Sequence, residues 1–249
     1  MVGLWRSCNS LACPAGATAT VCPVNGSTGI QEGDEVAGIG LDRPQARQDR
    51  SVRVAAIAAI VGLGAYVGGW WLAGSVRDGY DPREQAISEL FELGAPWTSR
   101  GWVVAGLLLS GVALIAFGPA LDRGLPGTGR LGPLLVVTSG VFTVLVVGAP
   151  CSPGCPGTGS AFNDTAHTIT AGVGYASLVT APLAFAWRLR QVAPRLAAWS
   201  WTLGGVAVAG FAIRYLGVLP QWLGAQQRLF NTIADLWYLL VAIHLLRQP

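Results

Sequence analysis

The stretch between Trp102 and Leu121 reads WVVAGLLLSGVALIAFGPAL and contains no charged residue. A helix rises about 1.5 Å per residue, so roughly 20 apolar residues cross the ~30 Å hydrocarbon core of a bilayer. Five further apolar runs of similar length occur in the chain, at 54–76, 131–150, 168–187, 197–219 and 229–246. The sequence therefore predicts an all-α protein, a bundle of six transmembrane helices.

The composition agrees with a membrane protein. Hydrophobic residues make up 52% of the chain and charged residues 12%, against roughly 25% charged residues in soluble domains. The net charge of +3 is too small to indicate nucleic-acid binding. One pattern of small residues, Gly64 to Gly68, is typical of close helix packing in membranes.

Arginines are distributed unevenly between the two sides of the predicted bundle. With six spans, the N-terminal segment, the 122–130 and 188–196 loops and the C-terminus share one side. Ten arginines lie near the membrane on that side and four on the other. Because basic residues accumulate in cytoplasmic loops, we predict a multi-pass plasma-membrane protein with both termini in the cytoplasm. The segments 77–101 and 151–167 then face outward.

The first fifty residues differ from the remainder. Residues 1–50 contain Gly, Ser, Thr and Pro without helical or alternating periodicity, and they include Cys8, Cys13 and Cys22. Such a segment cannot build a core, so we predict a disordered cytoplasmic tail. Met1 is the only Met in the chain. An alternative hypothesis is therefore that the gene start is over-extended and that translation begins later, at a codon that does not encode Met. Residues 51–249 form the predicted membrane domain.

A short amphipathic helix is predicted between the first and second spans. Asp81 suits the N-cap position and Pro82 the first helical position. Apolar residues then recur on one face, and Gly94 with Pro96 ends the pattern. Such a helix lies at the membrane interface, either as a structural lid or with Ser88 and Glu89 facing a cavity.

The 151–167 segment carries several reactive side chains. Cys151 and Cys155 flank a Pro-Gly turn on the oxidising side, which favours a disulfide over a metal site that includes His167. Asp164 and His167 are three residues apart at the start of the fourth span. They form either a helix cap with an interfacial imidazole, or a carboxylate–imidazole pair that moves protons.

Two charged residues interrupt the last two spans. Arg214 and Asp235 fall inside apolar runs, where charges usually face the bundle interior and pair. A structural ion pair between them is one interpretation, and a headgroup site or proton relay is the other. Arg228, at the mouth of the sixth span, adds a candidate anion-binding group.

Several motifs resemble a bacterial and archaeal membrane family known as domain of unknown function 998. They are Tyr80-Asp81-Pro82, Ile87-Ser88-Glu89-Leu90, Leu93-Gly94-Ala95-Pro96, Cys151 to Cys155, Asp164 with His167, and Gln227-Arg228. The resemblance covers roughly residues 54–246. It implies a six-helix membrane protein and no established activity.

We interpret the chain as a protein that binds membrane lipid or another small amphiphile at its outer side, or that acts as a partner subunit. The alternative is a membrane enzyme for a lipid-like substrate, with Ser88, Asp164 and His167 as catalytic groups. Glu89, Arg214, Arg228 and Asp235 are the candidate ligand-binding residues. The only two histidines, His167 and His244, lie at opposite ends of the bundle, and nucleotide or hydrolase motifs are absent. We therefore predict no cofactor and no metal, and the pattern favours no particular oligomeric state.

Overall fold

The computed structural model describes residues 43–158 and 161–248, apart from the side chains of residues 43–49. Within that part there are six long helices, three short 3-10 helices and no strand. All six long helices are long and apolar enough to cross a membrane, which confirms the predicted all-α, six-span architecture. The elements are α1 (Arg43–Val76), η1 (Ile87–Phe91), α2 (Trp97–Gly124), α3 (Leu131–Leu145), η2 (Val146–Gly148), α4 (Phe162–Leu189), α5 (Pro194–Tyr215), η3 (Pro220–Trp222) and α6 (Leu223–Leu246).

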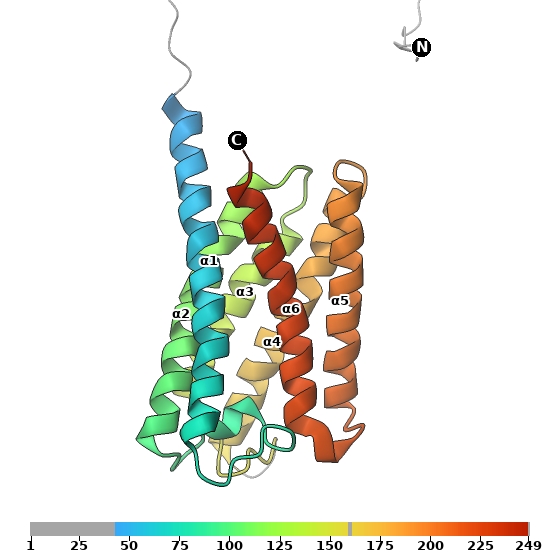
Figure 1. The fold of residues 1–249 in the computed structure, drawn as a ribbon. Coiled ribbons are helices and arrows are strands. Elements are labelled where there is room, and N and C mark those ends of the chain that lie inside the picture. Colours follow the sequence, from blue (N-terminus) through green and yellow to red (C-terminus); the bar gives the residue numbers. More distant parts are fainter. Residues whose placement is uncertain (1–42, 159–160, 249) are drawn as a thin grey trace, which may run out of the picture. The chain divides into compact units, whose positions relative to one another are not determined.

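The six long helices pack in chain order, each against the next, and α6 returns to pack against α1 and also contacts α4 (Figure 1). Short connections between consecutive spans make neighbours in sequence neighbours in space. Phe117, Phe185, Trp237 and Tyr238 are fully buried in the apolar core. Large apolar side chains such as Val112 on α2 are exposed on the outside, as expected for surfaces that face lipid tails.

Several helix ends differ from the predicted spans. The helices α2 and α4 have 28 residues each, because a helix continues through the polar interface after its apolar run ends. Conversely, α5 ends at Tyr215, before the predicted 219. Gly217 and Leu219 adopt positive φ values of 67° and 59°, and a proline follows, so the helix cannot continue.

The N-terminal boundary also differs from the prediction. The helix α1 begins at Arg43, so residues 43–50 are helical and do not belong to a disordered tail. The remaining part of the predicted tail, residues 1–42, lies outside the described residues. The described helices all belong to one compact unit, Leu41–Pro249.

The predicted amphipathic helix from Asp81 does not form; only the five-residue 3-10 helix η1 does. The carbonyls that an α-helix would use for its own bonds are taken by the start of α6. The N–H of Gly224 donates to Glu84 O at 3.2 Å and that of Ala225 to Arg83 O at 2.9 Å. The first amides of any helix lack partners within the helix, so this tertiary contact outweighs the local capping signal.

The apolar side of η1 is buried against the bundle. Ile87, Leu90 and Phe91 belong to a small apolar cluster with Tyr66 of α1 and Val103 of α2. Pro82 and the turn before η1 are exposed. The segment therefore covers one end of the helix bundle and forms part of the wall of the site described next.

Candidate functional site

A cavity of about 550 Å³ lies at the end of the bundle that carries η1. We call it the η1 cavity. Its walls come from η1, from α2 to α6, and from residues 154–158 in the loop before α4. Aromatic and apolar side chains alternate with polar ones along these walls. Of the predicted site residues it brings together Ser88, Glu89, Cys155, His167 and Arg214, whereas Asp164, Arg228 and Asp235 lie elsewhere.

Arg214 is the cation of the η1 cavity. It lies in the last turn of α5 and is half-buried. It forms no hydrogen bond or ion pair with any side chain or carbonyl in the described part of the chain. A guanidinium presents five donors in a planar fork that suits carboxylate and phosphate groups. Arg214 is thus available to an anionic group that enters the cavity.

Gln227 and Tyr175 link the cavity to both η1 and the bundle interior. The side-chain Oε1 of Gln227 accepts from the N–H of Ile87 at 2.7 Å, and its Nε2 donates to the Tyr175 hydroxyl at 2.9 Å. Both residues line the cavity. The sequence analysis assigned neither residue a role. Gln227 was noted only as part of the motif Gln227-Arg228, and Tyr175 falls in an apolar run like any core aromatic residue.

His167 is held by the main chain. Its Nδ1 lies 2.8 Å from the carbonyl oxygen of Ala149, an atom that only accepts, so Nδ1 carries the proton. The other ring nitrogen, Nε2, is then the acceptor of the neutral imidazole. Asp164 instead holds the loop that precedes α4, because its carboxylate accepts from the N–H and the hydroxyl of Ser152 at 2.6 and 3.0 Å.

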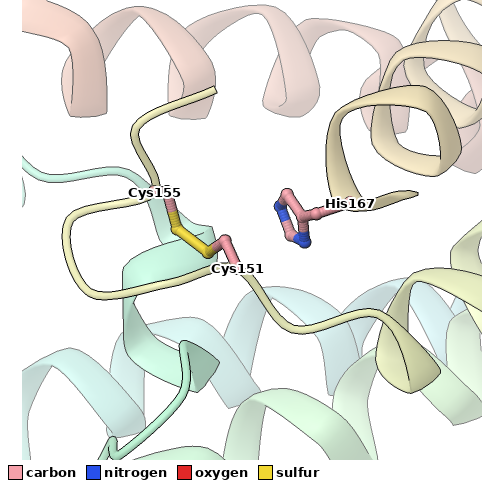
Figure 2. Close-up of side chains that lie close together, drawn as sticks. All are labelled: Cys151, Cys155 and His167. Carbon is pink, nitrogen blue, oxygen red and sulfur yellow. A yellow bond between two sulfur atoms is a disulfide. The ribbon is translucent and has the colours of Figure 1, made fainter. Parts of the chain in front are cut away.

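Cys151 and Cys155 form a disulfide beside His167 (Figure 2). The donor atoms of these three residues lie within 4.8 Å of one another. Metal ions bind cysteine as the thiolate, and the sulfurs are here bonded to each other. The disulfide closes residues 151–155 into a covalent loop. This disulfide loop forms part of the wall of the η1 cavity.

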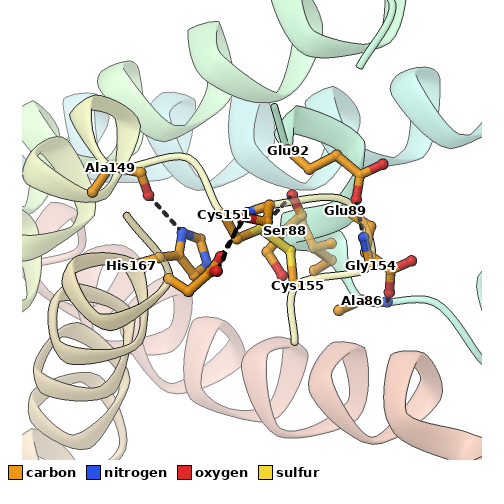
Figure 3. Close-up of a disulfide and its surroundings, with 12 residues drawn as sticks. Ala86, Ser88, Glu89, Glu92, Ala149, Cys151, Gly154, Cys155 and His167 are labelled. Carbon is orange, nitrogen blue, oxygen red and sulfur yellow. Dashed lines mark hydrogen bonds between the residues drawn. A yellow bond between two sulfur atoms is a disulfide. The ribbon is translucent and has the colours of Figure 1, made fainter. Parts of the chain in front are cut away.

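Glu92 joins three segments at this end of the bundle, and Figure 3 shows its hydrogen bond with Gly154 of the disulfide loop. One carboxylate oxygen pairs with Arg77 at 2.6 Å and the other accepts from the N–H of Gly154 at 2.7 Å. Arg77 also donates to the carbonyl of Glu89, and the N–H of Leu93 donates to Cys151 O at 2.8 Å. The disulfide loop, η1 and the end of α1 are therefore fixed to one another.

The carboxylate of Glu89 serves η1 itself. Oε1 accepts from the N–H of Ala86 at 2.8 Å and Oε2 from Nε2 of Gln85 at 3.0 Å. These bonds satisfy an amide at the start of the short helix. Glu89 thus lines the cavity while each of its carboxylate oxygens accepts one hydrogen bond from the protein, and its role as a ligand-binding residue stays a prediction.

Arg228 is a clamp between α6 and the segment before η1. It donates to the carbonyls of Pro82, Gln85 and Gly224 at 2.7 to 3.0 Å, and to the hydroxyl of Tyr80. Burial raises the pKa of Tyr80, against the opposing effect of Arg228, so the hydroxyl stays neutral as the partner of the guanidinium. Arg228 therefore holds protein carbonyls, and its role as an anion-binding group stays a prediction.

Arg214 and Asp235 do not form the predicted ion pair, which is absent among the described residues. Arg214 lies one residue from the end of α5, whereas Asp235 lies about three turns into α6. A helix rises about 5.4 Å per turn, so the two charges lie at different depths. Asp235 faces a second, smaller cavity at the centre of the bundle.

Comparison with known proteins agrees with this architecture. No curated protein and no solved structure matches the sequence. The model of a family described as "Protein of unknown function (DUF998)" matches residues 60–244. That range runs from the middle of α1 almost to the end of α6 and includes every residue that lines the η1 cavity. The chain therefore belongs to the DUF998 family of membrane-span proteins.

Proposed function

We propose that this multi-pass membrane protein binds a lipid or another small amphiphile with an anionic headgroup in the η1 cavity. The observation that carries the proposal is a cavity of about 550 Å³ with one unpaired cation, Arg214, at its wall. Binding sites for small molecules commonly measure 300–1,000 Å³ and combine apolar walls with a few polar groups. The η1 cavity has both properties.

The distribution of side chains supports a specific orientation of the ligand. Arg214 supplies the charge for a phosphate or carboxylate, and the hydroxyl of Ser88 lies on the same cavity. Phe91, Phe142 and Phe230 line it as well, and these rings suit an alkyl chain. We therefore place the headgroup at Arg214 and the alkyl chain against the phenylalanines. This orientation uses both the polar and the apolar part of the cavity lining.

The arginine distribution supports access from the outer leaflet. The η1 end carries fewer membrane-proximal arginines than the opposite end, so we propose that it faces outward and that both termini are cytoplasmic. An amphiphile in the outer leaflet of the plasma membrane then reaches the cavity without crossing the bilayer.

A thermal-shift experiment on the full chain in detergent tests the proposal. The probes are lysophosphatidylglycerol, which is anionic, and lysophosphatidylcholine, which is zwitterionic. We expect the anionic lipid to raise the melting temperature more, and Arg214→Gln to weaken its binding by about tenfold or more, because a charged hydrogen bond contributes ~1.5–3 kcal/mol.

The matched control is Arg190→Gln, which removes an arginine that stacks on Trp187 and does not line the cavity. This variant should respond to the lipid as the natural chain does. Equal stabilisation by both lipids, or an unchanged response of Arg214→Gln, would refute the proposal. Mass spectrometry of the recovered lipid separates binding from the enzymatic alternative, because only an enzyme that uses Ser88 or His167 converts it to product.

A further inference from the structure

A second cavity lies deeper in the bundle, and polar side chains line it together with four leucines. It measures about 30 Å³ and is enclosed by five of the six long helices. Its polar lining consists of Tyr66, Ser110, Ser139, Thr143, Tyr175, Asn231 and Asp235. Polar side chains inside a membrane bundle are costly and commonly mark ion or substrate sites. The presence of seven of them around one small space therefore requires a physical explanation.

Two oxygens in this lining lack hydrogen-bond donors. Oδ1 of Asn231 and Oδ2 of Asp235 are buried and accept no hydrogen bond from the described residues. The residues are 2% and 8% exposed, so bulk water does not compensate. A buried acceptor without a donor costs about 1–3 kcal/mol, and more when it is charged. Both oxygens belong to side chains that line the cavity.

Two of the neighbouring hydroxyls, those of Ser110 and Thr143, add acceptors and no donors. Ser110 donates its proton to the carbonyl of Leu107 at 3.1 Å, and Thr143 donates to that of Ser139 at 2.8 Å. Nδ2 of Asn231 lies 3.1 Å from the Tyr66 hydroxyl. With these protons used, the oxygens of Ser110 and Thr143 offer only lone pairs. The unpartnered oxygens of Asn231 and Asp235 and the lone pairs of these two hydroxyls thus belong to side chains around one small cavity.

We propose that this cavity is a binding site for a sodium ion, with the carboxylate of Asp235 as its counter-charge. Hard cations prefer carboxylate, amide and hydroxyl oxygens, which are the groups that line the cavity. A single carboxylate neutralises a monovalent ion, whereas a divalent ion would leave a net charge in the membrane interior. A space of about 30 Å³ holds no more than about two water molecules, so the ion must be small and largely dehydrated.

The two cavities are adjacent, which gives the ion a route of entry. Tyr175 and Thr143 line both the small cavity and the η1 cavity. The Tyr175 hydroxyl is held by Gln227, which in turn holds η1. A sodium ion therefore enters from the η1 end past these two side chains. The site itself does not depend on amphiphile binding.

A proton is the competing occupant. Asn231 and Asp235 are four residues apart on α6, so their side chains are neighbours on one helix face. A protonated Asp235 that donates to Oδ1 of Asn231 would satisfy both oxygens without an ion. The two occupants differ in a measurable way, because only the first makes the stability of the protein depend on sodium.

The experiment measures thermal unfolding of the full chain in detergent while NaCl replaces choline chloride at constant ionic strength. A ligand that binds only the folded state raises stability as its concentration increases. We expect the melting temperature to rise with sodium, and to rise less with potassium. Asp235→Asn should weaken the apparent sodium affinity by about tenfold or more. Ser110→Ala, a milder change in the same lining, should weaken it less.

Asp122→Asn is the matched control, because Asp122 is exposed and pairs with Arg188 away from both cavities. It should retain the sodium response of the natural chain. Binding of radioactive sodium to the purified natural chain and to Ser110→Ala decides the question if Asp235→Asn does not fold. A natural chain that ignores sodium, or an Asp235→Asn or Ser110→Ala chain with undiminished sodium affinity, overturns the proposal and leaves the proton as the occupant.

Discussion

At the scale of single residues, the site depends on a few carboxylates with different tasks. Glu92 and Asp164 are both buried and both hold the disulfide loop, the first through Gly154 and the second through Ser152. Asp235 has no such partner for Oδ2. Buried charges are stable when they are paired and hydrogen-bonded. The contrast separates two structural carboxylates from one that is available to a ligand.

Glu92→Gln tests the structural role. An amide keeps the shape of the side chain but offers one acceptor in place of two, so either Arg77 or Gly154 loses its partner. Charged hydrogen bonds contribute about 1.5–3 kcal/mol each, and we expect the free energy of unfolding to fall by about that amount. Glu84→Gln, on an exposed side chain in the same segment, should change it by less than about 0.5 kcal/mol. Equal melting temperatures for the two variants would contradict the assignment.

At the scale of elements, α1 and α2 approach each other backbone to backbone. A Cβ at Gly69 would lie 2.6 Å from Trp102 O, and one at Gly106 would lie 2.7 Å from Ala65 O. The predicted packing pair was different: at Gly64 and Gly68 a Cβ meets no atom within 4 Å. The spacing of small residues indicated that close packing occurs, but the rotation of α1 decided which glycines are used.

Gly69→Ala should therefore destabilise the bundle. The added methyl group meets main-chain atoms that cannot move independently, and overpacking of this kind costs about 1–3 kcal/mol. Gly68→Ala, one position away on the same helix, should leave stability unchanged or raise it slightly, since Ala favours helix. Unfolding of both variants in detergent provides the comparison. A loss confined to Gly68→Ala would mean that α1 is rotated differently.

At the scale of the whole molecule, the ring of helices places all the polar loops at two ends. The 77–96 and 216–222 segments lie at the η1 end, together with the disulfide loop, and the C-terminus lies at the other (Figure 1). The arginine count predicts which end is cytoplasmic. The architecture is the same in either orientation, so a separate measurement is needed.

Two matched threonine replacements measure the orientation. Thr98→Cys lies at the start of α2 near η1, and Thr128→Cys lies in the loop between α2 and α3; both positions are exposed. Each is placed in a chain whose Cys8, Cys13 and Cys22 are serine. In intact cells a membrane-impermeant maleimide should label the first variant and not the second. Labelling of Thr128→Cys alone would invert the predicted topology.

The sequence by itself determined the fold class and the number of spans. The length of an apolar run and the thickness of a bilayer are local quantities, so six runs such as 102–121 suffice. The disulfide between Cys151 and Cys155 could also be predicted from the local sequence, because only three residues separate the two cysteines. The conformation of the segment before η1 could not be predicted locally. It depends on the distant amides of Gly224 and Ala225, which bind the carbonyls that the predicted helix would have used.

Only the tertiary structure decided which polar residues share a site. Whether Arg214 meets Asp235 depends on the depth and rotation of two helices, and these are set by packing along their whole length. The same packing brings Tyr66, Ser110 and Asp235, which lie on three different helices, to one cavity. No spacing along the chain encodes that convergence, because side chains far apart in sequence meet only once the bundle has closed.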